Sequence, residues 1–318
     1  MTSTRSYTDT GHLLKLINEK YPIGIDQIVF HRDLIGYVYF VSGSSGKFVL
    51  KLYRNFDTDN ALRSIKIINY LENHHYPVVS ILPTRSGDRH VTVQTLQGPS
   101  VAILFRFIEG AEPDLETEIT PLGRQVGRLH ALMKEYPEPL ICRGKDFYID
   151  RYITILHDLD YISRRIDDLA AYGCELWTSM ERLPAGFCHG DLHTGNMRQS
   201  GPNEYVFFDF DIASDTHSLI DVATLCDCSD FNCFDEAAYS KTMCMFERFY
   251  QGYRVEREIS DGEIAAMFDF IAIRHYELIA TITRCHGLDR LSRAFLDEQY
   301  EWLMNWKNLC ERKGLPKG

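Results

Sequence analysis

The sequence lacks a surplus of basic residues: 34 lysines and arginines stand against 45 aspartates and glutamates, so the formal net charge is −11. Proteins that bind nucleic acid through its phosphates need excess positive charge to displace counterions. We therefore expect no nucleic-acid partner. A negative charge is compatible with a cationic substrate, and it is also the ordinary charge of a solubilising acidic surface.

Long apolar runs are lacking as well. The N-terminal MTSTRSYTDTGHLLKL has no continuous apolar stretch of the kind that a signal peptide needs, and no run of about 18 apolar residues occurs elsewhere. We expect neither export nor a membrane span. The nine cysteines form an odd set without a regular disulfide framework. These features predict a cytoplasmic protein with reduced thiols.

The sequence also lacks internal repeats and low-complexity tracts, and a chain of 318 residues is long enough for about two domains or lobes. In the first hundred residues, runs rich in β-branched and aromatic residues alternate with turn clusters and two stretches of helical apolar spacing. This pattern predicts strands over 37–41, 47–53, 90–95 and 101–107, and helices over 10–19 and 60–73.

The rest of the chain predicts mostly helices, over 120–135, 149–171 and several stretches of 235–312. One interruption has β character: residues 196–199 and 205–208 flank a Ser-Gly-Pro-Asn turn and predict a hairpin. Because the turn is centred between Pro202 and Asn203, antiparallel pairing would place Asn196 opposite Asp209 at the open end of the hairpin.

The segment FCHGDLHTGN, residues 187–196, places a carboxylate and an amide five positions apart, at Asp191 and Asn196. The hairpin would return Asp209 beside the amide. Mg²⁺ bound to nucleotide phosphates takes one or two protein oxygen ligands, which Asn196 and Asp209 could supply. Asp191 would then remain available to orient and deprotonate an acceptor hydroxyl.

HGDLHTGN followed by FFDFD resembles the aminoglycoside phosphotransferase and choline kinase superfamily, a branch of the protein-kinase-like fold. VLK at 49–51, FRFIEG at 105–110 and GRQVGRLH at 123–130 carry the same resemblance. It covers nearly the whole chain and implies a bilobal α+β fold. The implied lobes are a small nucleotide-binding lobe over 1–108, an antiparallel sheet with a helix, and a larger, mainly helical catalytic and substrate-binding lobe over 109–318. ATP is expected between the lobes.

The resemblance also implies roles for single residues. Asp191 looks like the catalytic base, with His193 as a further contact to the transferred phosphate and His189 as a brace for the loop. Asn196 and Asp209 look like the Mg²⁺ ligands.

For the nucleotide, the resemblance implies that Lys51 binds the phosphates of ATP and that the backbone from Phe105 to Phe107 binds adenine. Asp211 and Asp215 are candidates for contact with the substrate or with a second metal ion. The implied activity is transfer of the γ-phosphate of ATP to a hydroxyl of a small polar molecule: an amino alcohol, a sugar or an aminoglycoside. The YQGY sequence at 250–253 resembles the homoserine-kinase-like branch.

Alternative functions remain open at the level of sequence. Ser64 stands where a helix glutamate would pair with Lys51, so the chain could be a weakly catalytic nucleotide-binding module unless another acid serves, such as Asp57 or Asp59. A kinase acting on protein serine or threonine is a further alternative. His189 and His193, four residues apart with Asp191 between them, would also suit a metal-dependent hydrolase.

Overall fold

The structure is a computed structural model that describes residues 9–33, 36–95, 98–288 and 291–313. The chain forms two compact units: Met1–Ala111 with Arg198–Asp211, and Glu112–Met197 with Ile212–Gly318. The expected lobe division at residues 108 and 109 stays a prediction. Within the described residues, no helix is both long enough and apolar enough to span a bilayer.

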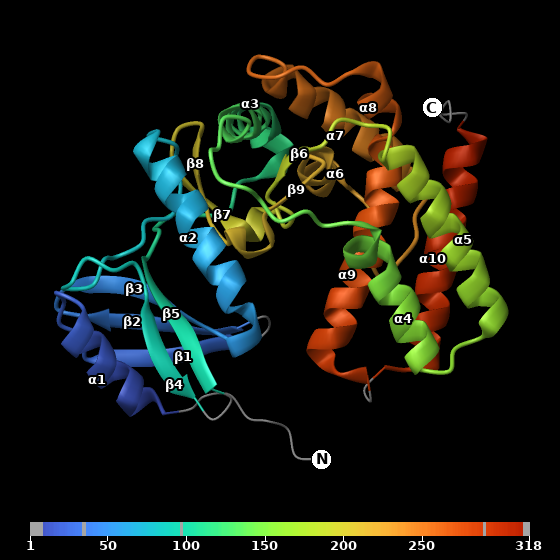
Figure 1. Ribbon diagram of the computed structural model, residues 1–318. Helices are drawn as coiled ribbons and strands as arrows, with labels where there is room; N and C mark the ends of the chain where they lie inside the picture. Colours follow the sequence, from blue (N-terminus) through green and yellow to red (C-terminus); the bar gives the residue numbers. More distant parts are fainter. Residues whose placement is uncertain (1–8, 34–35, 96–97, 289–290, 314–318) are drawn as a thin grey trace. The chain divides into compact units, whose positions relative to one another are not determined.

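An antiparallel sheet of five strands is the centre of the first unit (Figure 1). Four of its strands were predicted, and β1 was missed. Almost every residue of β1 is exposed, so the alternation that marks a half-buried strand is absent. In the order in which they pair, the strands are β1 (Gln27–Asp33), β2 (Gly36–Gly43), β3 (Gly46–Tyr53), β5 (Gly98–Arg106) and β4 (Val91–Thr95).

One face of this sheet packs into a core with α1 (Thr10–Lys20), whose Leu13 and Ile17 are buried. Leu50 and Leu52 of β3 lie in the same core. Since side chains alternate along a strand, Lys51 points to the opposite face. The unit also contains a short 3₁₀ turn, η1 (Asn55–Asp57), and the predicted second helix, α2 (Thr58–Asn73).

The predicted hairpin is present and consists of β7 (Met197–Gly201) and β8 (Glu204–Phe207). Its two-residue turn contains Asn203 in the left-handed region, with φ of 57°. Two backbone hydrogen bonds attach it to the first unit: Val79 N–H donates to the Phe207 carbonyl, and Gln199 N–H to the Ala111 carbonyl, both at 2.9 Å. The pairing of Asn196 with Asp209 stays a prediction.

The second unit is mainly helical. Its two short strands, β6 (Gly186–Cys188) and β9 (Ser214–Thr216), pair with each other. Its helices are α3 (Leu115–Met133), the π-helical turn η2 (Asp146–Asp150), α4 (Arg151–Asp158), α5 (Ser163–Met180), α6 (Leu219–Cys226), α7 (Ala237–Tyr253), α8 (Asp261–Ala265), α9 (Met267–His286) and α10 (Arg293–Arg312).

Two of the predicted helices differ from the structure. The single helix expected over 149–171 is two helices, α4 and α5, because Asp160 takes a left-handed conformation with φ of 48° and ends the first one. The helix expected to begin at Thr120 begins at Leu115. There the Asp114 side chain caps it by accepting the Glu116 N–H at 3.0 Å.

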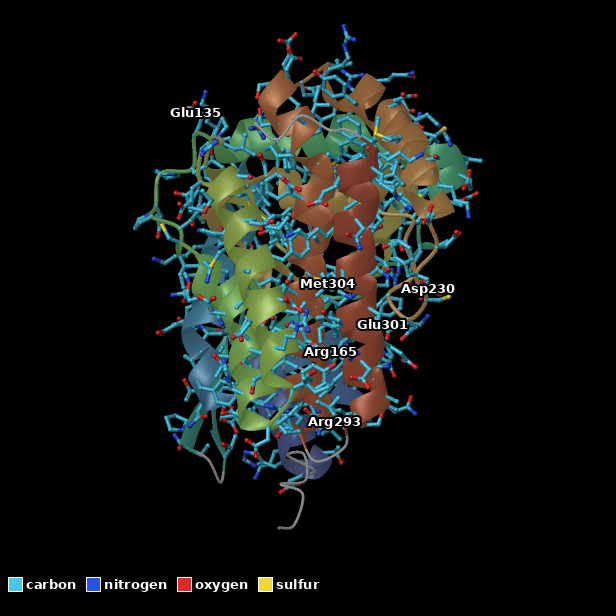
Figure 2. All side chains as sticks on the ribbon, turned by 90° about the vertical axis from the view of Figure 1, so that its right-hand side faces the viewer. Glu135, Arg165, Asp230, Arg293, Glu301 and Met304 are labelled. Carbon is cyan, nitrogen blue, oxygen red and sulfur yellow. The ribbon has the colours of Figure 1, made fainter. Side chains whose placement is uncertain are left out.

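Helices α5 and α10 run side by side, as Figure 2 shows with Arg165 of α5 and Glu301 of α10 labelled. Arg165 donates to Asp297 of α10 at 2.5 Å and stacks over the Tyr300 ring, 4.5 Å from its centroid. These contacts are partly exposed, so we expect buried apolar residues of the two helices, such as Leu169 of α5 and Leu303 of α10, to contribute more to stability than the ion pair does.

Helices α3 and α7 approach so closely that glycine is required where their backbones meet, most tightly at Gly252. A Cβ atom on Gly252 of α7 would lie 1.8 Å from the Thr120 carbonyl oxygen of α3. That oxygen belongs to the backbone, so the two helices would have to separate. The close packing of α7 against α3 therefore requires that residue 252 has no side chain.

We expect Gly252→Ala to lower the free energy of unfolding by about 3 kcal/mol, the upper end of the usual cost of overpacking. The better helix propensity of alanine offsets less than about 1 kcal/mol of this. Chemical denaturation measures the change. Gly186→Ala is the matched control, because its new Cβ would meet nothing within 4 Å. Equal stability of the two variants would contradict the close approach.

Candidate functional site

The predicted catalytic loop runs from His189 to Asn196 and connects β6 with β7. Its first residues are fixed by one buried carboxylate, that of Asp221 on α6. The Asp221 carboxylate accepts the N–H of His189 at 2.7 Å and the N–H of Gly190 at 2.9 Å. The Asp191 N–H in turn donates to Nδ1 of His189 at 3.3 Å.

Further contacts hold Asp221 itself in place. His130 Nε2 lies 3.1 Å from Asp221, and His130 Nδ1 lies 2.8 Å from the Tyr253 hydroxyl. Burial lowers the pKa of His130, which keeps the ring neutral, so Nε2 carries the proton and Nδ1 accepts from Tyr253. Burial alone would raise the pKa of Asp221, but His130 and the loop N–H groups outweigh it and hold that pKa below its usual value.

Gly190 is another position where the backbone requires glycine. Its φ is +86°, and a Cβ there would lie 3.1 Å from the backbone oxygen of Ile212. The sharp turn at Gly190 lets two successive N–H groups reach the same carboxylate. It also directs the next residue, Asp191, out of the β6 strand.

Asp191 and Asn196 meet within this loop. The Asn196 amide nitrogen donates to the Asp191 carbonyl oxygen at 2.9 Å and to Oδ2 of its carboxylate at 3.0 Å. Because only the NH₂ group can donate, these bonds fix the orientation of the amide. The Asn196 oxygen therefore points away from Asp191 and is the atom that could bind a cation.

His193 lies beside the same carboxylate. Its Nδ1 accepts the Gly195 N–H at 3.1 Å, so Nε2 carries the proton, and Nε2 lies 3.7 Å from Asp191 Oδ2. The His193 side chain is 49% exposed. It can therefore contact a ligand as well as Asp191.

The other oxygen of Asp191 is bound by an arginine that the sequence did not single out. Arg274 of α9 donates from Nη2 to Asp191 Oδ1 at 2.5 Å. The same guanidinium pairs through Nη1 with Glu277, one turn further along α9. We call Asp191, His193, Asn196, Arg274 and Glu277 the Asp191 cluster.

Burial alone would raise the pKa of Asp191, since the charged form loses its hydration. The neighbouring His193 N–H and the Arg274 guanidinium outweigh burial and hold the pKa of Asp191 well below its usual range. The carboxylate is therefore ionised at neutral pH, which is the state that a proton acceptor needs.

The first unit holds a second group of predicted residues. Lys51 of β3 donates to Asp209 Oδ1 at 2.7 Å and also pairs with the Asp211 carboxylate. The Tyr53 hydroxyl donates to the other oxygen of Asp211 at 2.9 Å. Asp211 lies in the short 3₁₀ turn η4 (Phe210–Ile212). We call Lys51, Tyr53, Asp209 and Asp211 the Lys51 cluster.

The charged groups of the Lys51 cluster shift one another's pKa values. Burial disfavours the Lys51 ammonium, but the Asp209 and Asp211 carboxylates outweigh it and hold the pKa of Lys51 above its usual value. Burial and the nearby Asp209 raise the pKa of Asp211 to about 6, against the opposing effect of Lys51. Asp209 has a left-handed backbone, with φ of 70°, which is strained for a residue other than glycine.

The acid partner of Lys51 was an open question in the sequence. Ser64 of α2 is buried, and Glu72 on the same helix lies 3.3 Å from Arg89 instead. The counter-charges of Lys51 come from Asp209 and Asp211. The two acids that pair with Lys51 therefore lie outside α2, and they are not Asp57 or Asp59, the candidates that the sequence suggested.

Two further predicted groups have defined surroundings. In the Phe105–Phe107 segment, the Arg106 N–H donates to Ser80 at 2.9 Å and the Phe107 N–H to Lys47 at 3.3 Å, so those amides are already engaged by carbonyls. Asp215 lies on β9, where its N–H donates to the Ile141 carbonyl at 2.9 Å. Asp215 belongs to neither cluster.

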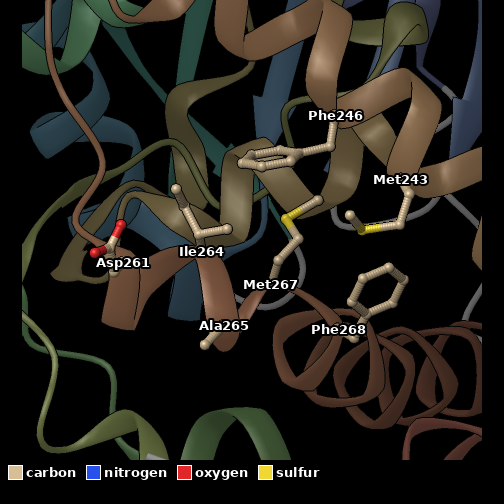
Figure 3. Close-up of a pocket in the computed structure, with 7 residues that line it drawn as sticks. All are labelled: Met243, Phe246, Asp261, Ile264, Ala265, Met267 and Phe268. Atoms are coloured by element: carbon tan, nitrogen blue, oxygen red, sulfur yellow. The ribbon is translucent and has the colours of Figure 1, made fainter. Parts of the chain in front are cut away.

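A cavity of about 290 Å³ lies among α7, α8 and α9 and is drawn in Figure 3. Its lining is almost wholly apolar, with one carboxylate at its edge, that of Asp261. None of the residues of the Asp191 cluster lines it. The remaining lining residues are Met243, Phe246, Ile264, Ala265, Met267 and Phe268.

Sequence reasoning missed Asp221, Tyr53 and Arg274. Asp221 had a usable signal, because an acid in the apolar run LIDVATLC must be buried in a helix and therefore must be paired. Tyr53 follows Lys51 by two residues on β3, and residues two apart on a strand lie on the same face. Arg274 had no such signal, since it approaches Asp191 only through the packing of α9.

Solved structures with the same fold include two small-molecule kinases. Amicoumacin kinase hAmiN, in complex with AMP-PNP, Ca²⁺ and Ami, is 22% identical, with a TM-score of 0.74 over 96% of this chain and 94% of its own. A microcompartment-associated aminopropanol kinase is 19% identical, with a TM-score of 0.77 over 97% of this chain and all of its own. The predicted α+β, protein-kinase-like fold is confirmed.

Among curated proteins, a homoserine kinase from Bradyrhizobium sp. is 29% identical over 196 residues, which are 58% of this chain and 56% of that enzyme. The sequence pattern of the "Phosphotransferase enzyme family" matches residues 26–259. This match spans most of the chain and includes every residue of the Lys51 cluster, together with Asp191, His193 and Asn196. The protein therefore belongs to the phosphotransferase enzyme family.

Proposed function

We propose that this protein transfers the γ-phosphate of ATP to a hydroxyl of a small polar molecule. The observation that carries the proposal is the contact of Asn196 with Asp191, at 3.0 Å, on a loop whose backbone Asp221 fixes. The ionised carboxylate of Asp191 suits a proton acceptor. The amide oxygen of Asn196, which points away from Asp191, suits a cation ligand. Membership of a phosphotransferase family supports the same reaction.

In the proposed reaction Asp191 acts on the acceptor. Its carboxylate accepts the hydroxyl proton while the hydroxyl oxygen bonds to the γ-phosphorus, and the bond from that phosphorus to ADP breaks. His193, with its Nε2 proton directed to the same place, can contact the transferred phosphate. Its exposure supports this assignment.

Three of the predicted residues would serve the nucleotide and its metal ion. Lys51 is a buried ammonium suited to the phosphates, and Asn196 and Asp209 offer oxygen atoms to Mg²⁺. Bound Mg²⁺ would neutralise phosphate charge as it develops during transfer. Because the N–H groups of Arg106 and Phe107 are engaged, adenine would use carbonyl oxygens of that segment or the next amide, that of Ile108. The nucleotide analogue in amicoumacin kinase supports ATP as the donor.

The alternative of an imidazole-based metal hydrolase fits the contacts less well. His189 is fully buried, and its Nδ1 accepts a backbone N–H from Asp191. His193 Nδ1 likewise accepts the Gly195 N–H. Each imidazole thus has a bracing bond at the nitrogen nearest the loop, which supports a kinase-type loop over a zinc site.

We expect Asp191→Asn to lower the rate of phosphoryl transfer by about two to four orders of magnitude, the usual contribution of a positioned general base. Affinity for Mg²⁺-ATP should survive, because Asn196 and Asp209 remain. The measurement pairs calorimetric titration with Mg²⁺-ATP and single-turnover transfer to an acceptor found by an ADP-release screen.

Loss of ATP affinity and transfer together would instead make Asp191 a structural or metal-binding residue. Unchanged transfer would remove it as the base. Wild-type protein that binds Mg²⁺-ATP but releases no ADP with any acceptor would favour the nucleotide-binding module.

We expect Lys51→Ala to raise KM for ATP and lower kcat, because the ammonium would hold the phosphates in line for transfer. Loss of a hydrogen bond to a charged group costs about 1.5–3 kcal/mol, so kcat/KM should fall roughly 10- to 100-fold. Steady-state kinetics measures it. Lys47→Ala, on the same strand but with a side chain 64% exposed, is the matched control. Equal kinetics for both variants would contradict the role of Lys51.

A further inference from the structure

The Asp191 side chain belongs to a loop and is 31% exposed, so burial alone does not set the orientation of its carboxylate. Rotation about the last torsion of an aspartate is soft, whereas a proton acceptor works only when its lone pair points at the reacting hydroxyl. Two donors fix this rotation. Asn196 donates to Oδ2 at 3.0 Å, and Arg274 donates to Oδ1 at 2.5 Å.

The two carboxylate oxygens of Asp191 have different surroundings. Oδ2 faces Asn196 and also His193, whose Nε2 lies 3.7 Å away. Oδ1 is held by Arg274. A carboxylate oxygen can accept two hydrogen bonds, so Oδ1 keeps a second lone pair, and the guanidinium fixes the direction of that lone pair. An acceptor hydroxyl can deliver its proton there.

Arg274 is itself fixed by a second ion pair. Its other terminal nitrogen, Nη1, pairs with Glu277 one turn further along α9. The side chains of Arg274 and Glu277 are only 13% and 3% exposed, so this pair is better shielded from water than a surface ion pair is. A planar guanidinium that is held at both terminal nitrogens cannot rotate without breaking one of its two pairs.

A third ion pair extends this arrangement to the neighbouring helix. Arg151, the first residue of α4, donates to Glu277 Oε1 at 3.0 Å. Its Nε donates to the Phe147 carbonyl at 2.6 Å, and its guanidinium lies 4.0 Å from the centroid of the Phe147 ring. Phe147 belongs to η2, and π-helical turns of this kind are frequent at functional sites. Three consecutive ion pairs thus connect η2 with Asp191.

The charges of this group of side chains balance without a ligand. Asp227, after the end of α6, interacts electrostatically with Arg274, and Arg284 of α9 with Arg151. The group therefore has three carboxylates and three guanidinium groups: Asp191, Glu277 and Asp227 with Arg151, Arg274 and Arg284. The contact between Arg274 and Asp191 is accordingly complete within the folded protein and needs no bound anion.

We propose that Arg274 is a positioning residue for the Asp191 base, and that Glu277 and Arg151 fix Arg274 in turn. The inference rests on the proposed function, in which Asp191 accepts the acceptor's proton. The proton moves to the open lone pair of Oδ1 while the hydroxyl oxygen bonds to the γ-phosphorus and the bond from that phosphorus to ADP breaks. Arg274, Glu277 and Arg151 keep their protonation states throughout and act through Asp191.

A double-mutant comparison separates positioning from a general structural role. Arg274→Gln should lower the rate constant of transfer roughly 10- to 100-fold, the cost of a misplaced reacting group, and leave the affinity for Mg²⁺-ATP nearly unchanged. In an Asp191→Asn protein the same change should cost less than about twofold, because the base that Arg274 positions is already absent. Single-turnover transfer to the best acceptor of the ADP-release screen, with calorimetric titration of Mg²⁺-ATP, measures all four proteins.

Three further variants sharpen the comparison. Arg151→Gln removes the ion pair furthest from Asp191 and should give a smaller loss, roughly 3- to 10-fold, that also disappears in the Asp191→Asn protein. Arg274→Lys keeps the charge but loses the planar fork, so its rate should lie between those of wild type and Arg274→Gln. Arg165→Gln is the matched control, since Arg165 also donates to an aspartate, Asp297, at 2.5 Å, and it should have the same small effect in both backgrounds.

Equal losses from Arg274→Gln in the two backgrounds would overturn the proposal. A wild-type rate in that variant, or a loss confined to Mg²⁺-ATP affinity, would do the same. If Arg274→Gln does not fold, Arg274→Lys and Arg151→Gln carry the same comparison. Failure of the proposed function looks different: the wild-type protein would transfer no phosphate to any acceptor, or Asp191→Asn would transfer it at the wild-type rate. Either result would remove the base and its positioning residue together.

Discussion

One buried carboxylate, Asp221, fixes the first residues of the loop from His189 to Asn196. An ionised group inside a protein costs several kcal/mol unless fixed donors replace its lost water. Asp221 obtains these donors from two successive backbone N–H groups, those of His189 and Gly190, and from His130. The loop N–H groups therefore provide hydrogen bonds that the buried carboxylate needs, and the carboxylate in turn fixes the conformation of the loop. Neither arrangement is favourable without the other.

The same balance recurs at Lys51, with the signs reversed. Here a buried ammonium is compensated by two carboxylates, and the strained backbone of Asp209 persists because that pairing holds it. The charged groups of either cluster would cost free energy if they were buried without their partners. In each cluster a buried group stays charged because its partners outweigh the effect of burial on its pKa. Binding and catalytic sites commonly hold charged groups in this way before a ligand binds.

Much of this could be predicted from the sequence, because the decisive signals were local. The hairpin followed from its Pro202-Asn203 turn, and the core face of β3 followed from alternation. The exposed strand β1 could not be found, since its burial pattern carries no period. The break at Asp160 depends on a single left-handed residue. Arg274 could not be predicted, because it lies 83 residues from Asp191 in the sequence and only the packing of α9 brings the two side chains together.

The source of the counter-charges of Lys51 has a consequence for regulation. In protein kinases the equivalent lysine pairs with a glutamate on a mobile helix, so that moving the helix turns activity on or off. Here the partners are Asp209 and Asp211, which follow the β7–β8 hairpin, while α2 offers Ser64 at the corresponding place. A displacement of α2 would leave these ion pairs intact. The ion pairs of Lys51 therefore do not depend on the position of α2, in contrast to the lysine–glutamate pair of protein kinases.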